Sequence, residues 1–345
     1  MSLRVLLETI GYPGDDGTRT EASRELYTLA RRNKVGSLYV QALDDADATG
    51  DIEDKLTNRQ DFQARITRTV EALAEDVPAR YDYAVVKSTH DFWADSKDID
   101  IVLFEGELAS LQREFVDAGY AFCGDSPTTF DVEHPETGIQ IDAQSAFSLQ
   151  DVVYFDKDTI RDNVAMRTVR GTDVPVAAQP DDLALIVIHS VTEQLFILKE
   201  YFAAVHALEQ FSQSEFDRFV RTVEANDIGP ACRAFFPLVA AISQEVYGRH
   251  PPYMQELLNR YPPYEFEVRA LFENGLETPH RYTNQTGIRT VLGKFKNDVF
   301  RESLLSQAPR LVKPETLSHI GKELLLRRER DHYVHDTSDM EPQGG

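Results

Sequence analysis

The chain has 345 residues and a formal net charge of −22 at pH 7, with 58 acidic residues against 36 Lys and Arg. Hydrophobic residues make up 42% and aromatic residues 10%, which excludes a disordered chain and predicts two or three folded domains. The negative charge argues against nonspecific nucleic-acid binding, and no apolar run reaches the roughly 18–20 residues that span a membrane. We therefore expect neither a membrane nor a nucleic acid as a partner.

The acidic residues are spread along the chain instead of forming one tail. An acidic surface repels itself, and molar salt screens that repulsion because the Debye length falls to about 3 Å. The composition predicts a halophilic protein, with an ordinary acidic protein as the alternative. We expect a cytoplasmic location because the first residues turn acidic too early for a secretory signal. Cys123 and Cys232 are far apart and are expected to be buried apolar residues, not zinc ligands.

Residues 1–80 predict a helical N-terminal element. Apolar residues recur at helical spacing on both sides of a turn at Asn33–Lys34. The same spacing continues from Phe62 to Leu73, until Pro78 breaks it.

Residues 81–178 change to short apolar and alternating runs, which predict a compact core of strands and helices. A helix there is expected to end near a glycine, and two pairs of strands are expected to be joined by turns rich in Gly, Pro and Thr. The segments in chain order are strand Tyr83–Lys87, strand Ile99–Phe104, a helix ending near Gly119, a hairpin about Pro135–Gly138 and a second hairpin about Gly171–Asp173.

Residues 179–330 predict a helical C-terminal domain, followed by a disordered tail at 331–345. The domain opens with a long apolar helical stretch that starts at Pro180 and is capped by Asp181 or Asp182. Two Pro-Pro-Tyr triplets further along the domain are interpreted as helix stops.

Carboxylates interrupt the strands of the predicted core. Asp98 and Asp100 are two residues apart on a strand, so their side chains leave the same face. Asp142 lies in an alternating strand, and the three carboxylates converge if that strand packs beside Ile99–Phe104. Because an unpaired buried carboxylate is costly and Mg²⁺ or Mn²⁺ prefers oxygen ligands, the pattern predicts a divalent metal. Asp131 is the competing third ligand, and an exposed position is the alternative for Asp142.

Hydroxyl side chains follow the first strand, about ten residues before the Asp pair. Lys87, Ser88 and Thr89 end that strand in a turn whose free backbone N–H groups suit a phosphate. The alternative is a plain turn or helix cap. Together with the carboxylates, this turn predicts in-line attack on an α-phosphate, with two metals stabilising the attacking and leaving oxygens.

The motifs "VVKST", "DIDIVLF" and "GIQIDAQ", in this order, resemble the nucleotidyltransferase superfamily related to DNA polymerase β. The version here is most similar to a large branch of uncharacterised nucleotidyltransferases, over roughly residues 20–210. The resemblance implies an α+β fold, with a polymerase-β-like core of a small mixed sheet and helices between a helical N-terminal element and a helical C-terminal domain.

The resemblance also implies roles for single residues. Asp98 and Asp100 are expected to ligate metal, and Asp142 to ligate one metal and act on the attacking hydroxyl.

On the phosphate side, the resemblance implies that Ser88 and Thr89 hold the triphosphate, with Lys87 beside it. Lys199 is expected to reach the triphosphate from the following helical domain, as a helical lysine does in some relatives, although a solvated lysine would share its pattern. Ser88 occupies the place where the family usually has glycine, and its Cβ stands where the backbone must approach phosphate closely.

The expected activity is transfer of a nucleoside monophosphate from an NTP to a hydroxyl acceptor, a small molecule or protein in preference to RNA. A catalytically weak nucleotide-binding or regulatory module of the same fold is the alternative, favoured by Ser88. A metal-dependent glycosyltransferase also uses an Asp-x-Asp motif, but a longer α/β region usually precedes it. In this chain, only helices and one strand are expected before the Asp-x-Asp motif.

Overall fold

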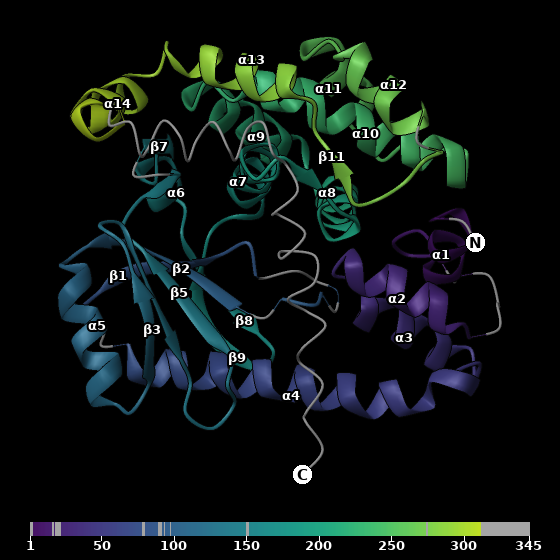
Figure 1. The fold of residues 1–345 in the computed structure, drawn as a ribbon, viewed down its shortest axis with the longest axis horizontal. Helices are drawn as coiled ribbons and strands as arrows, with labels where there is room; N and C mark the ends of the chain where they lie inside the picture. The colour runs from purple at the N-terminus through teal and green to yellow at the C-terminus, as the bar shows by residue number, and fades with distance from the viewer. Residues whose placement is uncertain are drawn as a thin grey trace.

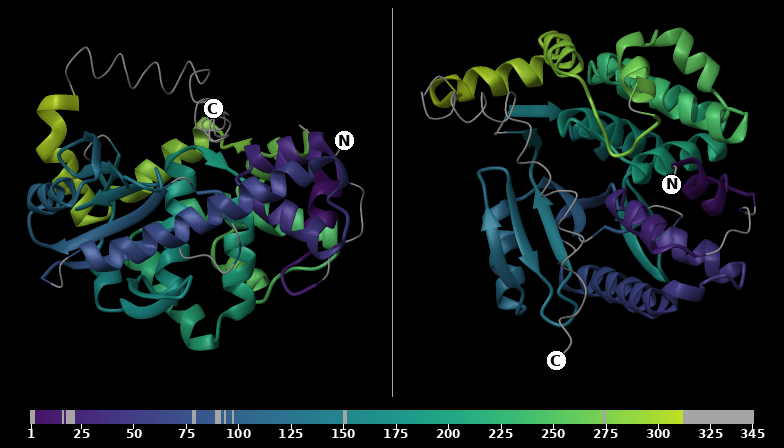
Figure 2. Two further views of the ribbon diagram at one scale, coloured as in Figure 1. Left: turned by 90° about the horizontal axis from the view of Figure 1, so that it is seen from below. Right: turned by 45° about the vertical axis from the view of Figure 1, so that its right-hand side comes forward.

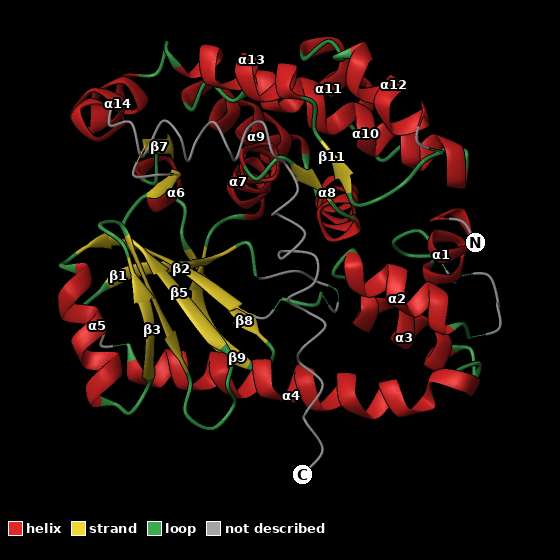
Figure 3. Ribbon diagram, viewed as in Figure 1, coloured by secondary structure: helices red, strands yellow, loops and turns green. Residues whose placement is uncertain are grey.

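The computed structural model describes residues 3–15, 17, 22–77, 80–88, 92, 94–96, 98–149, 152–273 and 275–311. Helices surround a central seven-stranded mixed sheet, which confirms the predicted α+β class (Figures 1 and 3). Thr89 and the tail at 331–345 lie outside the described residues.

The N-terminal residues form helices, as predicted. A turn separates the second and third helices at Asn33–Val35, and the Ser23 hydroxyl caps the second by accepting the Leu26 N–H at 3.4 Å. The last helix of the element is long and lies along both the third helix and the sheet (Figure 1). These elements are α1 (Leu3–Ile10), α2 (Arg24–Arg32), α3 (Gly36–Asp45), the 3₁₀ turn η1 (Gly50–Ile52) and α4 (Glu53–Asp76).

The sheet follows the order β3-β4-β5-β2-β1-β9-β8. β2 pairs in parallel with β5, β1 pairs in parallel with β9, and the other neighbours are antiparallel. Both predicted hairpins are present as β4–β5 and β8–β9. The strands are β1 (Asp82–Val86), β2 (Asp98–Glu105), β3 (Ala121–Asp125), β4 (Thr129–Glu133), β5 (Gln140–Gln144), β8 (Ala165–Val169) and β9 (Thr172–Val176), and helix α5 (Leu108–Asp117) connects β2 to β3.

The edge strand β3 and a small separate ribbon, β6 (Phe147–Leu149) with β7 (Val152–Phe155), were not predicted, because their side chains do not follow one clear period. Cys232 is buried as expected, whereas the prediction for Cys123 is wrong: it is exposed because it lies on that edge strand.

The apolar stretch after Pro180 is not one helix. α7 (Gln179–Thr192) stops at Gln194, whose φ of +57° is left-handed, and the short strand β10 (Leu195–Phe196) precedes α8 (Leu198–Gln210). The predicted cap is also wrong. Ala178 occupies the N-cap without a side-chain bond, since Asp181 and Asp182 accept bonds from other parts of the chain.

The described residues after α8 are mainly helical, and helices end before both Pro-Pro-Tyr triplets, as predicted. The N-terminal helices α1–α3 lie against these C-terminal helices (Figure 2). Within the described residues, no helix combines the length and apolar character needed to cross a bilayer. The remaining elements are α6 (Asp158–Arg161), α9 (Gln213–Ala225), α10 (Gly229–Tyr247), α11 (Met254–Arg260), α12 (Glu265–Glu273), β11 (His280–Arg281), α13 (Asn284–Lys294) and α14 (Asp298–Leu311).

Buried apolar side chains form two clusters, one on each face of the sheet. On one face, side chains such as Val85 and Ile101 pack against α4 and α5. On the other face, Val86 and Val102 join a larger cluster shared by α1–α3 and the C-terminal helices. Each cluster draws on more than one of the segments 1–80, 81–178 and 179–330, whose boundaries stay a prediction. The second face carries the carboxylates described next.

Candidate active site

A row of carboxylates crosses the sheet on the face toward the C-terminal helices. Asp100 of β2 stands directly beside Asp142 of the parallel strand β5, and Asp131 of β4 stands beside Asp142 on its other side. Asp98 is one pleat earlier on β2, next to Gln140. Because paired residues share a face, the backbone register brings the three predicted aspartates and the competing Asp131 to one place.

Lys87 neutralises part of this row. Its Nζ lies 2.7 Å from Asp100 Oδ1, and only 10% and 11% of the two side chains are exposed. Burial lowers the pKa of Lys87, but the charges of Asp100, Tyr154 and Asp142 outweigh burial and hold this pKa above its ordinary value. Lys87 is therefore charged and acts as a countercharge inside the site.

The backbone at Lys87 is held in an unusual conformation. Its φ is +54°, a left-handed value that non-glycine residues seldom adopt. Its N–H donates to the carboxylate of Asp182 at 2.6 Å, from the first turn of α7. Burial raises the pKa of Asp182 to about 6, although this bond and the Lys87 charge oppose the rise. Asp182 thus fixes the turn that aims Lys87 at the carboxylates.

Ser88 does not carry the left-handed backbone. In this turn, the left-handed conformation falls on Lys87, one position earlier. The Ser88 hydroxyl instead accepts the N–H of Asp100 at 3.3 Å and so ties the turn to the start of β2. Thr89, the other predicted phosphate contact, lies outside the described residues.

Asp142 has an oxygen without a partner. Its Oδ1 is buried and accepts no hydrogen bond in the structure. Burial raises its pKa to about 8, and the neighbouring charge of Asp100 adds to that rise, while Lys87 opposes it. A buried carboxylate oxygen normally has a donor or a cation, so Asp142 Oδ1 indicates a place where a ligand would be stabilised.

The donor chemistry fits a hard divalent cation, but the present side-chain positions do not form a complete ligand set. Among the described residues, no group of three or more His, Cys, Asp or Glu is arranged to hold a metal. One reason is visible at Asp100, whose Oδ1 is engaged by Lys87. The buried Asp142 Oδ1, beside the carboxylate of Asp100, is an oxygen ligand that fits a cation which also takes phosphate oxygens from a substrate.

Lys199 lies at the start of α8, within electrostatic range of the carboxylates. Its Nζ donates to Ser96 Oγ at 2.6 Å. Burial lowers the pKa of Lys199 and so does the charge of Lys34, whereas Asp98 and Asp100 raise it. The structure therefore places this predicted residue beside Ser96, which the sequence did not single out, and within range of the charges of Asp98 and Asp100.

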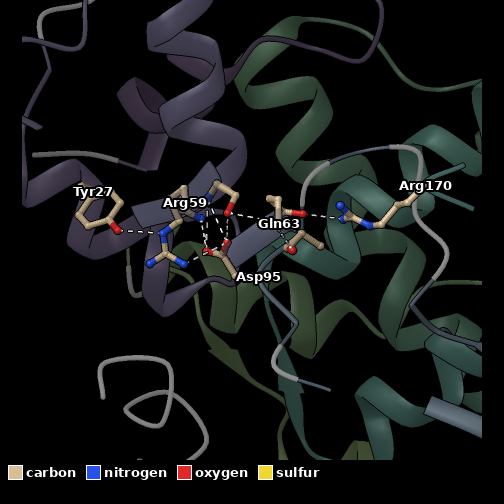
Figure 4. A network of polar contacts seen from close by, with 8 residues as sticks. Tyr27, Arg59, Gln63, Asp95 and Arg170 are labelled. Atoms are coloured by element: carbon tan, nitrogen blue, oxygen red, sulfur yellow. Dashed lines mark hydrogen bonds and ion pairs between the residues drawn. The ribbon is translucent and has the colours of Figure 1, made fainter. Parts of the chain in front are cut away.

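A small pocket opens beside the turn. Its polar lining includes Ser88, Ser96 and Asp98, while α4 and β9 supply apolar walls. Arg170, from the β8–β9 turn, lines it as well and donates to Gln63 Oε1 at 2.6 Å (Figure 4). The pocket joins the predicted phosphate turn to an apolar surface.

Asp95 anchors the segment between β1 and β2. Only 2% of it is exposed, and its carboxylate accepts the N–H groups of Gly36 at 2.7 Å and Ser37 at 3.1 Å, at the start of α3. Arg59 Nη1 of α4 lies 3.4 Å from the same carboxylate (Figure 4). A charge-assisted network thus fixes the segment that carries Ser96.

The sequence did not reveal every residue around the site. Asp182 was interpreted as a helix cap, and only the fold shows that it binds the Lys87 turn. Tyr154 and His189 form a further, partly buried pair, with 3.3 Å between Oη and Nδ1, and the charge of Tyr154 raises the pKa of Lys87. The available sequence signal was weak: polar residues in otherwise apolar segments, without a common motif.

Comparisons with known proteins add little. No protein-family model and no curated protein matches the sequence. An antigenic nucleotidyltransferase-like protein from Paracoccidioides brasiliensis is similar in structure at 12% identity and a TM-score of 0.30, over 50% of this chain and 92% of that one. The STING-associated CdnE c-di-GMP synthase from Capnocytophaga granulosa is similar at 13% identity and a TM-score of 0.29, over 81% of this chain and 96% of that one. The Thermotoga maritima CCA-adding enzyme is similar at 14% identity and a TM-score of 0.20, over 78% of this chain and 81% of that one.

Proposed function

We propose that the protein is a metal-dependent nucleotidyltransferase that moves a nucleoside monophosphate from an NTP to a hydroxyl acceptor. One observation carries the proposal. Asp100 and Asp142 are side by side on parallel strands, at a turn with Lys87 and Ser88, and one buried oxygen of Asp142 has no partner. The comparisons carry no weight here because their TM-scores are too low.

In the proposed reaction, the acceptor oxygen forms a bond to the α-phosphorus of the NTP. The bond from that phosphorus to the bridging oxygen of the β-phosphate breaks, and pyrophosphate leaves with the electron pair. The hydroxyl proton passes to the carboxylate of Asp142.

The other residues bind and orient the substrate. Ser88 and Thr89 are proposed to hold the triphosphate through the turn after β1, with the ammonium groups of Lys87 and Lys199 balancing its charge. Asp98, Asp100 and Asp142 are the residues that would hold Mg²⁺ or Mn²⁺. When bound, such an ion stabilises the negative charge that develops on the phosphate oxygens.

The acceptor is proposed to be a small molecule or a protein side chain. An RNA acceptor would need a basic surface to hold its backbone, and the chain carries a formal charge of −22. The apolar pocket beside Ser88 and Asp98 offers a surface for part of a substrate.

A binding module with little turnover is the second candidate, and one contact favours it. Lys87 Nζ engages Asp100 Oδ1 at 2.7 Å, so an ammonium stands where a divalent cation would need an oxygen. If Lys87 keeps that position with nucleotide bound, the protein would bind NTP without transferring it.

The decisive variant is Asp142→Asn. The side chain keeps its shape and Oδ1 has no hydrogen bond to lose, so we expect the fold to be unaffected. NTP binding is measured in molar KCl with each of the four labelled NTPs, with Mg²⁺, Mn²⁺ or EDTA. Wild type is compared with Asp142→Asn and with Asp125→Asn, an exposed carboxylate on β3 that serves as the matched control.

We expect wild type and the control to bind NTP only when the metal is present. We expect Asp142→Asn to bind NTP at least about tenfold more weakly under the same conditions. Pyrophosphate release with an acceptor library then separates the two candidates: release supports the transferase, and binding without release supports the binding module. Absence of NTP binding by folded wild-type protein contradicts both.

A further inference from the structure

Helix α13 and its C-cap turn their large apolar side chains away from the protein. These side chains stand at positions i, i+3, i+4 and i+7, so they form one stripe along a single face of the helix. Between 45% and 61% of each residue is exposed. The helix lies along the outer edge of the C-terminal helices, on the far side from the central sheet (Figure 1). This α13 stripe consists of Ile288, Val291, Leu292 and Phe295.

The buried residues of the same helix are polar. Thr286, Thr290 and Lys294 follow one another at intervals of four residues, so they share a face, and all three are buried. The helix packs against α10 and α7. A helix that served only to cover a core would bury its apolar face and expose its polar one. The core of this chain therefore does not explain the α13 stripe.

Specific hydrogen bonds fix α13 in this rotation. At its start, the carboxylate of Glu267 accepts the Thr286 hydroxyl and, at 2.8 Å, the N–H of Thr283. At its end, the ammonium of Lys294 donates to the carbonyl of Asn226. Turning the helix to bury the stripe would break these bonds and leave buried polar groups unpaired, which is costly. Exposure of the stripe is thus a fixed property of the fold.

Positive charge flanks the stripe. Residues 278–297 contain four basic residues and no Asp or Glu, in a chain with 58 acidic residues. Arg289 and Lys296 are exposed and follow the first and last residues of the stripe. The guanidinium carbon of Arg289 lies 4.8 Å and 5.3 Å from the ring centroids of Tyr264 and Phe266. Among the described residues, no carboxylate pairs with Arg289 or Lys296.

These charges distinguish between the surfaces that could cover the stripe. A second copy of α13 would bring Arg289 and Lys296 toward the same residues of the first, which is repulsive. An anionic membrane would repel a chain of net charge −22. A helix with its own apolar stripe and acidic flanking residues would cover the apolar side chains and pair with the exposed cations, as flanking charges do between paired helices.

We propose that the α13 stripe binds an amphipathic helix of a partner protein, whose apolar stripe is flanked by acidic residues. The inference goes beyond the proposed function and does not depend on it, because α13 carries none of the residues of the candidate active site.

The test measures binding of labelled synthetic peptides to the full-length protein by fluorescence anisotropy. Two peptides of about three heptads share one leucine stripe and differ only in flanking Glu or Lys residues. Titrations are made in molar KCl and at the lowest KCl concentration at which the protein stays folded. The test variant is Ile288→Ser/Leu292→Ser. The matched control is Phe122→Ser/Met166→Ser, which removes two exposed apolar side chains from the edge strands β3 and β8.

We expect the Glu-flanked peptide to bind wild type and the control alike, and the test variant at least about tenfold more weakly. Both double variants should melt close to wild type, since they change exposed residues. Lys296→Gln should weaken binding of this peptide at low KCl, and the effect should shrink in molar KCl because salt screens the charge. Lys-flanked peptide attracted by the acidic surface should bind the test variant as well as wild type.

Several outcomes would overturn the proposal. If the Lys-flanked peptide binds through the stripe as tightly as the Glu-flanked one, the acidic partner is wrong. If neither peptide binds, and sedimentation shows a wild-type dimer that the test variant dissociates, a second copy covers the stripe instead. If neither peptide binds, and phosphatidylglycerol vesicles bind wild type but not the test variant, a membrane covers it. Absence of binding by every probe, with a monomeric wild type, contradicts a docking role for α13.

Discussion

Three features of the structure restrain the backbone and side chain of Lys87. Its backbone is left-handed, its N–H is bound by Asp182, and its ammonium is paired with Asp100. Removing one partner of a buried ion pair leaves the other charge in a poorly solvated place, which is more costly than removing both. The pair is thus a structural feature, and at the proposed metal site it would compete with the cation for Asp100.

This gives a prediction for stability. Lys87→Met should lower the free energy of unfolding by about 3 kcal/mol, because the largely buried carboxylate of Asp100 loses its ion-pair partner. Adding Asp100→Asn should recover more than half of that loss. Urea denaturation of wild type, both single variants and the double variant measures the coupling. A double variant as unstable as the sum of the singles would contradict the interaction.

A second buried lysine lies away from the site. Lys294 of α13 is 3% exposed and donates to the carbonyl of Asn226. Burial lowers its pKa to about 7, against the opposing charges of Asp227 and Asp156. Between about pH 7 and the ordinary lysine pKa, the unfolded chain therefore holds a proton that the folded protein has released. The titration of Lys294 therefore raises the free energy of unfolding as the pH rises through that range.

The matching prediction compares wild type with Lys294→Met at several pH values. The unfolding free energy of wild type relative to the variant should rise above pH 7, by at most about 1.4 kcal/mol per pH unit, since one proton is involved. Urea titrations at neutral and alkaline pH measure it. A difference that stays constant with pH, or falls, would show that Lys294 keeps its proton when buried.

At the scale of elements, the segment between β1 and β2 links the sheet to the N-terminal helices. Asp95 carries this link by accepting two N–H groups at the start of α3, where the helix dipole favours a negative charge. The absence of a side chain on Gly36 allows the close approach: an added Cβ would stand 2.7 Å from Asp95 Oδ2. The geometry of Ser96, and through it Lys199, depends on this contact.

Gly36→Ala should therefore destabilise the protein by about 1–3 kcal/mol, although alanine is the better helix former. Gly124→Ala is the matched control, because its added Cβ meets no atom within 4 Å, and it should change stability by less than about 0.5 kcal/mol. Thermal melting of both variants checks the prediction. Equal stability of the two would mean that Asp95 does not need to approach the backbone of Gly36.

At the scale of the whole molecule, charge repulsion is the dominant electrostatic feature. The chain has 58 acidic residues against 36 basic ones, and many of its ion pairs are exposed and worth little. Compact folding therefore concentrates negative charge that only dissolved ions can screen.

We predict that the melting temperature rises steadily as KCl is increased from tens of millimolar to molar concentrations. The physical reason is screening, so sucrose at matched osmolality should have a smaller effect. Differential scanning calorimetry in both series measures it. A melting temperature that is flat or falling with KCl would contradict a protein adapted to high salt.

Local pattern was sufficient for much of the fold. Alternation predicted β1, β2 and both hairpins, helical spacing predicted α2 to α5, and the spacing of Asp98 and Asp100 determined that they share a face. These features depend on residues within a few positions of one another, where the backbone period alone decides which side chains lie together. The continuous helix predicted after Pro180 was wrong because the break at Gln194 leaves no such periodic signal.

Pairing between distant segments was decided by the tertiary structure. Asp142 lies beside Asp100 because β5 packs in parallel against β2, a register that the sequence allowed but did not require. The contacts of Lys87 with Asp182 and of Asn33 with Leu198 join residues 95 and 165 positions apart. No local period encodes such contacts, since they form only when separate elements bury their apolar faces against one another. The sequence by itself determined that Asp98 and Asp100 share one face of a strand, and the packing of the strands and helices decided which candidate residues lie beside them.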